Sequence, residues 1–237
     1  MEIISIAARF CGPPGSGNGG YVAGMLANHA GRPMRVALRK PPPLTVPMVV
    51  RHQAEERLEL RRDGELIAEA EPFEFSLQPP LTPTYMQALD ASRGYSGFRS
   101  HPFPTCFVCG PQRARGDGLR IFPGPLAGSE LVAAPWLADD SLCAADGKVC
   151  AEFIWAALDC PGYFAATGDG RVMLLGQIAA QIDRRVHAAE SCVVLGWKLS
   201  SEGRKHAVGT ALFDEDGECC ARAIATWIEP GATRQGG

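Results

Sequence analysis

A glycine-rich segment, residues 12–19 (GPPGSGNG), stands between a strand-like stretch and an apolar run. Loops of this kind bind phosphate when they open a helix, because the first backbone N–H groups of the helix point at the anion. A P-loop nucleotide site also needs a lysine and a hydroxyl, and Asn18 and Gly19 occupy those two places. A dinucleotide site needs an acidic residue about 20 residues further on, and residues 3–54 contain no Asp or Glu. We therefore expect neither class of nucleotide site.

The same segment retains the donors for an oxyanion. The amides of Gly19 and Gly20 begin the predicted helix and have no partner within it. They are suited to stabilising the charged intermediate of acyl transfer, with Asn18 as a further donor. The alternative is that Asn18 is an ordinary N-cap and the glycines serve close packing. Basic residues without acids surround the segment and suit either phosphate groups or a solvated face: Arg9, Arg32, Arg35, Arg39, Lys40 and Arg51.

A single carboxylate interrupts an apolar stretch, Asp159 within residues 155–162 (WAALDCPG). Such a group must be hydrogen-bonded or solvated, and burial raises its pKa while a nearby basic group lowers it. It belongs either to a site or to a local turn near Pro161. Cys160 would point about 100° away from it on a helix, and no histidine is close in sequence to activate the thiol, so packing is its simpler role.

The cysteines do not form an obvious disulfide or metal pattern. There are nine, an odd number, and several lie in apolar runs, which indicates a reducing, cytoplasmic environment. Cys106 and Cys109 have the spacing of half a zinc site, but no second pair follows at the usual distance. We therefore expect no metal.

Composition excludes several broad classes. The chain has 237 residues, 46% of them hydrophobic and 21% charged, which is typical of a folded globular protein. The net charge of −3 gives no basic surface for nucleic acid. No apolar run approaches the roughly 20 residues of a membrane span, and the N-terminus lacks the pattern of a signal peptide. We expect no nucleic-acid or membrane partner.

The predicted elements form two similar sets. Residues 1–78 read as a unit with one helix (19–30), residues 79–105 as a linker with a short helix (83–93), residues 106–230 as a second unit with one helix (149–164), and residues 231–237 as a tail. Strands are predicted in both units at 2–10, 34–39, 46–60, 66–75, 118–122, 130–136, 171–185, 192–200, 204–214 and 218–229.

An internal repeat supports a duplicated unit. Residues 63–70 (DGELIAEA) match residues 216–223 (DGECCARA) at five of eight positions, around a DG hairpin turn. The two predicted helices align more weakly, residues 21–26 with residues 153–158. One apolar helix and a set of antiparallel strands thus occur twice.

This arrangement resembles the hotdog fold, in which a curled sheet wraps a central helix. Residues 18–26 (NGGYVAGML) resemble the opening of the central helix in double hotdogs of the acyl-CoA thioesterase II type. Residues 192–228 resemble the strands of phenylacetyl-CoA thioesterase-like proteins, and residues 106–110 (CFVCG) with 118–121 (GLRI) resemble a segment that precedes the first strand of such proteins. The implied fold is α+β: a tandem hotdog of two antiparallel sheets, each wrapping a central helix, packed as an intramolecular pseudo-dimer.

The resemblance also implies a function and a divided site. Hotdog thioesterases place a carboxylate on one central helix opposite helix-start donors of the partner unit. Asp159 matches the catalytic carboxylate, whereas its aligned partner in the first helix is Ala27; Gly19 and Gly20 align with Ala151 and Glu152. The first half thus has the glycine donors without the carboxylate, and the second half has the carboxylate without the glycine donors. We expect one composite site with Asp159 as base or nucleophile and Asn18, Gly19 and Gly20 as its donors.

The expected substrate is a small-molecule acyl-CoA, and no cofactor is expected because coenzyme A is part of the substrate. The residues assigned to substrate binding are Tyr21, Arg39, Trp155 and Tyr163, although aromatic residues at such places are also common in a core. The alternative function is a non-catalytic acyl-CoA-binding protein. Open sheet edges make a homo-oligomer possible.

Overall fold

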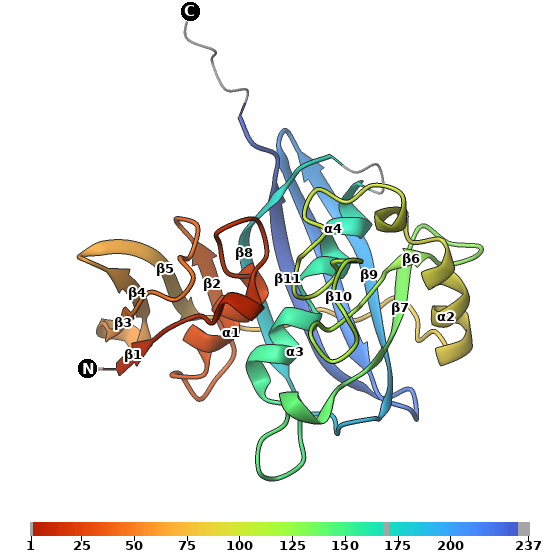
Figure 1. Cartoon of the computed structure of the whole chain (residues 1–237), viewed down its shortest axis with the longest axis horizontal. Helices are drawn as coiled ribbons and strands as arrows, with labels where there is room; N and C mark the ends of the chain where they lie inside the picture. Colours follow the sequence, from red (N-terminus) through yellow and green to blue (C-terminus); the bar gives the residue numbers. More distant parts are fainter. Residues whose placement is uncertain (1, 168–170, 232–237) are drawn as a thin grey trace, which may run out of the picture.

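The computed structural model describes residues 2–167 and 171–231, and its described strands form one antiparallel sheet (Figure 1). The strand order in the sheet is β1-β3-β4-β5-β2-β8-β11-β10-β9-β7-β6. The strands are β1 (Glu2–Ile4), β2 (Met34–Leu38), β3 (Met48–His52), β4 (Leu58–Arg62), β5 (Glu65–Pro72), β6 (Gly124–Pro125), β7 (Val132–Leu137), β8 (Leu174–Ile182), β9 (Ser191–Glu202), β10 (Lys205–Phe213) and β11 (Cys219–Ile228).

The expectation of two separate sheets is not confirmed. Strand β2 of the first half pairs with β8 of the second, with Met34 opposite Ala180 and Val36 opposite Ile178. Both strands would otherwise expose a row of backbone N–H and C=O groups at a sheet edge. Their pairing satisfies these groups and joins all the strands into a single sheet.

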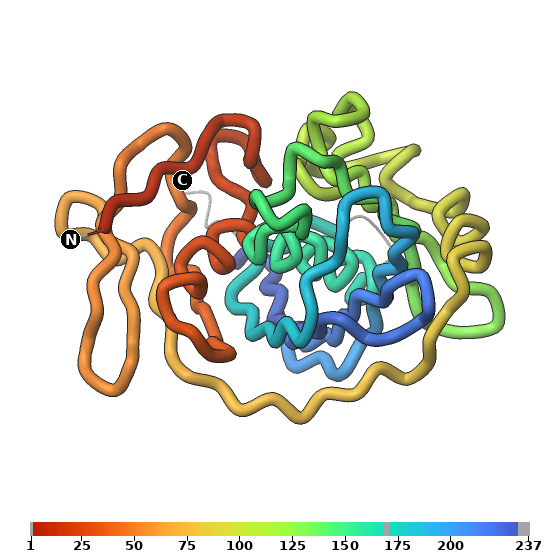
Figure 2. The backbone as a smooth tube through the Cα atoms, turned by 90° about the horizontal axis from the view of Figure 1, so that it is seen from below, coloured from red at the N-terminus to blue at the C-terminus, as the bar shows by residue number. Residues whose placement is uncertain are grey.

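Four α-helices accompany this sheet in the described residues: α1 (Gly19–Ala27), α2 (Tyr85–Arg93), α3 (Ala151–Ala157) and α4 (Cys160–Thr167). In Figure 1, α3 and α4 lie in front of the long strands β9–β11. The predicted helix at 83–93 is confirmed as α2, which begins at a capping box formed by Thr84 and Gln87. Figure 2 shows the connector that leads to α2 running along the outside from one half to the other. None of the described helices is both long and apolar enough to cross a bilayer.

Several predicted elements differ in extent from those observed. The strand predicted at 46–60 is a hairpin, β3 and β4, because Glu55 and Glu56 both adopt positive φ near 57° and reverse the chain. The strand predicted at 2–10 ends at Ile4, and residues 8–10 form a 3₁₀ turn. The segment 118–122 is not a strand: the Leu119 and Ile121 N–H groups bond to the 107–108 carbonyls instead.

The second predicted helix is broken in two. Helix α3 ends at Ala157 and α4 begins at Cys160, so that Leu158 and Asp159 form the junction. The Asp159 N–H donates to the Ala156 carbonyl at 3.1 Å, and the Gly162 N–H donates to the Asp159 carbonyl at 3.1 Å. Pro161 has no N–H to donate, which favours an interruption here. The carboxylate of Asp159 is therefore presented from a helix junction.

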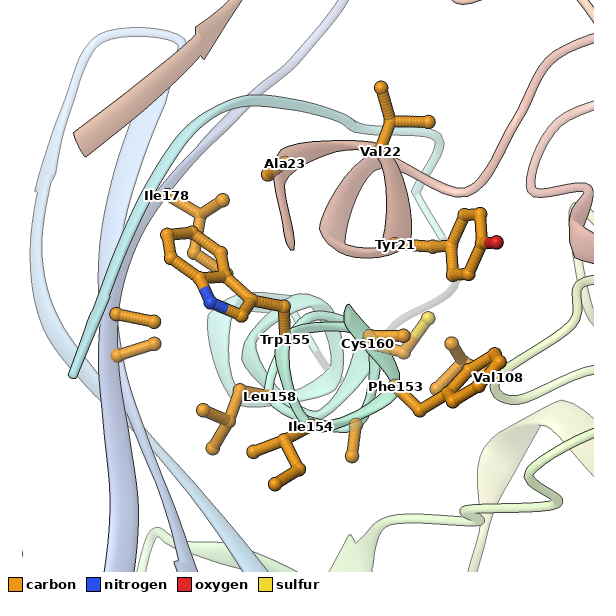
Figure 3. Packing of buried hydrophobic residues seen from close by; sticks show 14 of the residues in the cluster. Tyr21, Val22, Ala23, Val108, Phe153, Ile154, Trp155, Leu158, Cys160 and Ile178 are labelled. Atoms are coloured by element: carbon orange, nitrogen blue, oxygen red, sulfur yellow. The ribbon is translucent and has the colours of Figure 1, made fainter. Parts of the chain in front are cut away.

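Helices α1 and α3 pack antiparallel at very short range. A Cβ atom on Gly20 would lie 2.5 Å from Asp159 Cβ, and one on Gly24 would lie 2.6 Å from Glu152 Cα. Since ordinary carbon contacts are near 3.5–4.0 Å, only glycine fits at these two positions, one turn apart on α1. Figure 3 shows the consequence for the core: the Trp155 ring extends from α3 toward Ile178. The start of α1 is thereby held against the end of α3.

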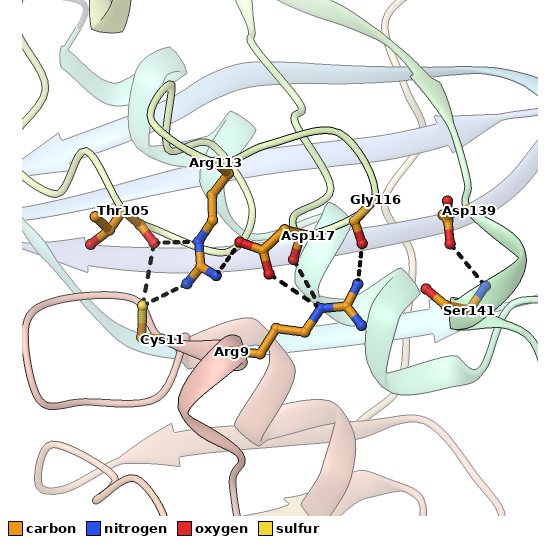
Figure 4. A network of polar contacts seen from close by, with 8 residues as sticks. All are labelled: Arg9, Cys11, Thr105, Arg113, Gly116, Asp117, Asp139 and Ser141. Atoms are coloured by element: carbon orange, nitrogen blue, oxygen red, sulfur yellow. Dashed lines mark hydrogen bonds and ion pairs between the residues drawn. The ribbon is translucent and has the colours of Figure 1, made fainter.

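An arginine network joins the N-terminal segment to the loop around residues 105–117 (Figure 4). Arg9 donates to the Gly116 and Asp117 carbonyls at 2.7 and 2.9 Å. Arg113 donates to the Thr105 carbonyl at 2.8 Å, to Cys11 Sγ at 2.9 Å and to the Asp117 carboxylate at 2.9 Å. These contacts fix the loop that carries Cys106 and Cys109 against the first half of the chain.

Candidate active site

Asp159 lies at the contact between the two halves of the chain. Its Oδ2 atom accepts hydrogen bonds from Asn18 Nδ2 and from the Gly20 N–H, both at 3.0 Å. Asn18 also caps α1, because its Oδ1 accepts the Tyr21 N–H at 2.9 Å. Asn18 is thus an N-cap, as one reading of the sequence expected, and in addition a donor to Asp159.

The second oxygen of this carboxylate is buried but unpartnered. Asp159 is 1% exposed, and its Oδ1 has no hydrogen-bond partner among the described residues. Burial raises the pKa of Asp159 to about 7, because the loss of solvation outweighs the two hydrogen bonds, which favour the ionised form. An unsatisfied buried carboxylate oxygen is costly in a purely structural role.

A pocket of about 420 Å³ includes Asp159 in its wall. Its lining combines residues of both halves: 12–14, 16–19 and 38–42 from the first, and Asp159, Tyr163, 173–176 and 227–230 from the second. Leu38, Met173, Leu175 and Trp227 make much of the surface apolar. This combination of an apolar wall with a few polar groups is typical of a small-molecule site.

The structure brings some of the predicted substrate residues to this pocket. Arg39 and Tyr163 line it, together with Lys40, which the sequence also indicated. Arg39 forms an ion pair with Glu69 and Lys40 with Glu65, and both cations remain about half exposed. Residues 3–54 contain no acidic residue, and the acidic partners of Arg39 and Lys40 belong to strand β5.

Two predicted substrate residues do not line the pocket. Tyr21 stacks on Phe10 with ring centroids 4.4 Å apart and packs near Phe153, and burial raises its pKa to about 12. Trp155 packs against Gly24 of α1. The predictions that Tyr21 and Trp155 bind substrate relied only on their positions in the helices. In the structure both side chains pack where α1 meets α3.

The two glycine amides have different roles. The Gly20 N–H is already engaged by Asp159, so it is not a free oxyanion donor in this structure. Gly19 lines the pocket, and within residues 2–167 and 171–231 its N–H donates to no partner. The one amide of the pair left for a ligand is therefore that of Gly19, at the first position of α1.

A cluster of three thiols, which residue spacing did not predict, lies in the wall of the same pocket. Cys106, Cys109 and Cys160 are all buried, and their sulfur atoms lie within 4.8 Å of one another. Hydrogen bonds from the other two thiols lower the pKa of Cys106. His101 also lines the pocket and lies 3.3 Å from Cys109 Sγ, and burial lowers its pKa. Only the CxxC spacing pointed to this cluster.

Solved structures with a similar fold include proteins named as thioesterases. A candidate thioesterase from Novosphingobium aromaticivorans DSM 12444 aligns over 97% of this chain and 95% of its own, with a TM-score of 0.60 and 16% identity. The tesB protein of Mycobacterium avium subs paratuberculosis aligns over 97% and 92%, with a TM-score of 0.62 and 13% identity. The chain therefore has the hotdog-like fold that the sequence predicted.

A third similar structure is a candidate oleoyl thioesterase from Lactobacillus plantarum, which aligns over 97% of this chain and 96% of its own, with a TM-score of 0.54 and 10% identity. No family model matches the sequence, and no curated protein matches it. This chain and these three structures therefore share a fold over nearly the whole chain. The chemistry depends on the residues of this chain's own site.

Proposed function

We propose that this protein is an acyl-CoA thioesterase that hydrolyses its substrate with Asp159. The observation that carries the proposal is the different surroundings of the two carboxylate oxygens of Asp159. Oδ2 is held by Asn18 and Gly20, while Oδ1 is buried, unpartnered among the described residues and part of a residue that lines the pocket. A fixed carboxylate with one free oxygen is suited to attack a carbonyl or to take a proton from water.

The Gly19 amide is the proposed oxyanion donor. It starts α1, lines the pocket, and has the positive end of the helix dipole behind it. Attack on a thioester carbonyl by water, with Asp159 as base, or by Asp159 itself, produces a negatively charged oxygen. A preorganised N–H at that place stabilises the charge as it develops, an effect worth about 10²–10³ in rate for one donor. The leaving group is the thiol of coenzyme A.

The lining of the pocket supports the substrate class. Its apolar wall suits an acyl chain, and cationic residues among the lining, Arg39, Lys40 and Arg204, suit the phosphates of coenzyme A. Arg39 and Lys40 already have acidic partners, so a bound phosphate would compete with Glu69 and Glu65. The proposed tandem hotdog has units at 1–78 and 106–230 and a linker at 79–105, an arrangement supported by the sheet order, in which β1–β5 are contiguous.

The test is thiol release from short, long and aromatic acyl-CoAs by the wild type and by Asp159→Asn. The asparagine oxygen can still accept the two hydrogen bonds, so the variant is expected to fold while release falls by at least about 100-fold. Asp183→Asn, an acid outside the pocket lining, is the control and should retain wild-type release.

The competing function is binding without hydrolysis. It has one observation in its favour, because Asp159 engages the Gly20 amide and leaves a single amide for an oxyanion. Thermal stabilisation of the wild type by an acyl-CoA, with no thiol release across the panel, would establish this alternative. Release that persists in Asp159→Asn would contradict the proposed mechanism.

A further inference from the structure

Three cysteines from two distant parts of the chain converge beside the pocket. Cys106 and Cys109 belong to the loop fixed by Arg113, and Cys160 is the first residue of α4. The Cys106 and Cys160 sulfur atoms are 3.8 Å apart, and all three sulfurs lie within 4.8 Å of one another. In a tetrahedral zinc site with Zn–S bonds of about 2.3 Å, the sulfurs are about 3.8 Å apart. Only a small contraction separates the observed trio from that geometry.

The loop that carries Cys106 and Cys109 forms a tight turn that ends at Gly110. A Cβ on Gly110 would lie 2.5 Å from the Cys106 carbonyl oxygen and 2.6 Å from its nitrogen, so this position requires glycine. The Gly110 N–H donates to the same carbonyl at 2.9 Å. This tight turn places Cys106 and Cys109 on one short stretch of backbone.

His101 contributes a hydrogen-bond donor to the trio. Its Nδ1 accepts the Phe103 N–H at 2.9 Å, which places the imidazole proton on Nε2 in the neutral ring. Nε2, 3.3 Å from Cys109 Sγ, is then a donor to that sulfur and not a metal ligand. Hydrogen bonds of this type around the ligands tune metal affinity. The histidine thus belongs to the surroundings of a three-sulfur site.

We propose that Cys106, Cys109 and Cys160 bind one Zn²⁺ ion through three thiolates, with the fourth position left to water or to a molecule in the pocket. All three cysteines line that pocket, so an ion can reach them and its open position can meet a ligand there. Thiolate ligands select zinc or another soft ion over magnesium and calcium. Binding releases the protons of the thiols, and the donor from His101 offsets part of the resulting negative charge.

The experiment uses Co²⁺ as a spectroscopic probe of the full chain. The protein is stripped with a chelator, kept reduced with a phosphine under argon, and titrated first with Co²⁺ and then with Zn²⁺. We expect one ion per chain, sulfur-to-cobalt charge-transfer bands with the intensity of three thiolates, visible bands typical of tetrahedral cobalt, and displacement of the cobalt by zinc. None of these readouts depends on hydrolysis, so their failure is distinct from failure of the proposed thioesterase activity.

Single alanine variants at the three positions test the assignment. Cys106→Ala, Cys109→Ala and Cys160→Ala should each lose about a third of the charge-transfer intensity and at least about tenfold in affinity. Cys192→Ala is the matched control, because Cys192 is equally buried but lies outside the trio, and it should bind like the wild type. Circular dichroism of the metal-free proteins identifies any variant that fails to fold, and the two remaining cysteine variants then carry the test.

Absence of charge-transfer bands in the reduced wild type would overturn the proposal. Bands of wild-type intensity in all three variants would also overturn it, because they would place the ion elsewhere. Loss of two free thiols on mild oxidation by peroxide, with no cobalt binding before it, would identify the trio as a disulfide-forming group and would also overturn it.

Discussion

The contact between α1 and α3 makes Gly20→Ala a direct test of how the site is held together. The new Cβ would lie 2.5 Å from Asp159 Cβ, 2.7 Å from the Trp155 carbonyl oxygen and 3.1 Å from Ala156 Cα. Two of these three atoms are backbone atoms and cannot rotate away. To restore ordinary contacts of about 3.5 Å or more, the helices must move apart by about 1 Å.

That displacement has two costs. Overpacking of a core contact destabilises by about 1–3 kcal/mol. The Gly20 N–H to Asp159 Oδ2 bond, now 3.0 Å, would lengthen beyond hydrogen-bonding range, at a further cost of about 1–2 kcal/mol. We expect a total loss of about 2–5 kcal/mol in the free energy of unfolding, which for a chain of this size lowers Tm by roughly 5–15 °C.

The assay is urea unfolding followed by tryptophan fluorescence, with calorimetry for Tm. Gly94→Ala is the matched control, because a Cβ there meets at closest a proline ring atom at 3.2 Å and lies outside the pocket lining. It should change the free energy of unfolding by less than about 1 kcal/mol. A Gly20→Ala protein as stable as the wild type would refute the close approach of α1 and α3.

Two further predictions concern a helix cap and an acid-sensitive turn. Asn18→Ala should lower the free energy of unfolding by about 1–2 kcal/mol and reduce thiol release, whereas Thr84→Ala, which removes the cap of α2, should cost about 1 kcal/mol and leave release unchanged. Burial alone would raise the pKa of Asp214, but the Glu218 N–H and Arg184 hold it below its usual value. A carboxyl whose pKa is lower in the folded state stabilises the protein above its unfolded pKa of about 3.9, and this stabilisation disappears as the pH falls through the folded value. The stability advantage of the wild type over Asp214→Asn should therefore shrink between pH 5 and pH 3 in urea unfolding, and an advantage independent of pH would contradict the assignment.

Local signals predicted the turns well. The DG pair at 63–64 lies in the hairpin between β4 and β5, and both residues have positive φ, 47° for Asp63 and 82° for Gly64. The DG pair at 216–217 occurs between β10 and β11, with Gly217 at 83°. Turn geometry of this type depends on the residues in the turn itself, so a single sequence contains the necessary information.

The composite site could be predicted in part. Alignment of the two predicted helices assigned the donors Asn18 and Gly20 to the start of the first helix and the carboxylate of Asp159 to the interior of the second. The structure places both donors within hydrogen-bonding distance of Asp159. The side-chain direction of Tyr21 and Trp155 was not accessible in this way, because it depends on which face of each helix meets the other. The spacing of Gly20 and Gly24 is a signal that would have located that face.

The remaining errors concern contacts between distant segments. The pairing of β2 with β8 joins residues about 140 positions apart, and nothing in either strand specifies its neighbour. The group of three thiols was missed for the same reason, because it depends on a contact between distant segments. Cys160 lies 54 residues from Cys106 along the chain and follows the helix break at Asp159. A prediction based on spacing along the chain finds a CxxC pair and misses a third ligand delivered by tertiary structure.

The antiparallel packing of α1 and α3 produces two contacts between helix ends, and within the described residues one of the two has the chemistry of the candidate site. The start of α1 meets the end of α3 at Gly20 and Asp159, and the end of α1 meets the start of α3 at Asn28 and Glu152. At the second contact an exposed Asn28 Nδ2 donates to Glu152 Oε2 at 2.9 Å. Glu152 stands where the first contact has Gly20, and Ala27 where it has Asp159. Without a buried carboxylate or a glycine amide, the second contact keeps the packing of the first and none of its chemistry.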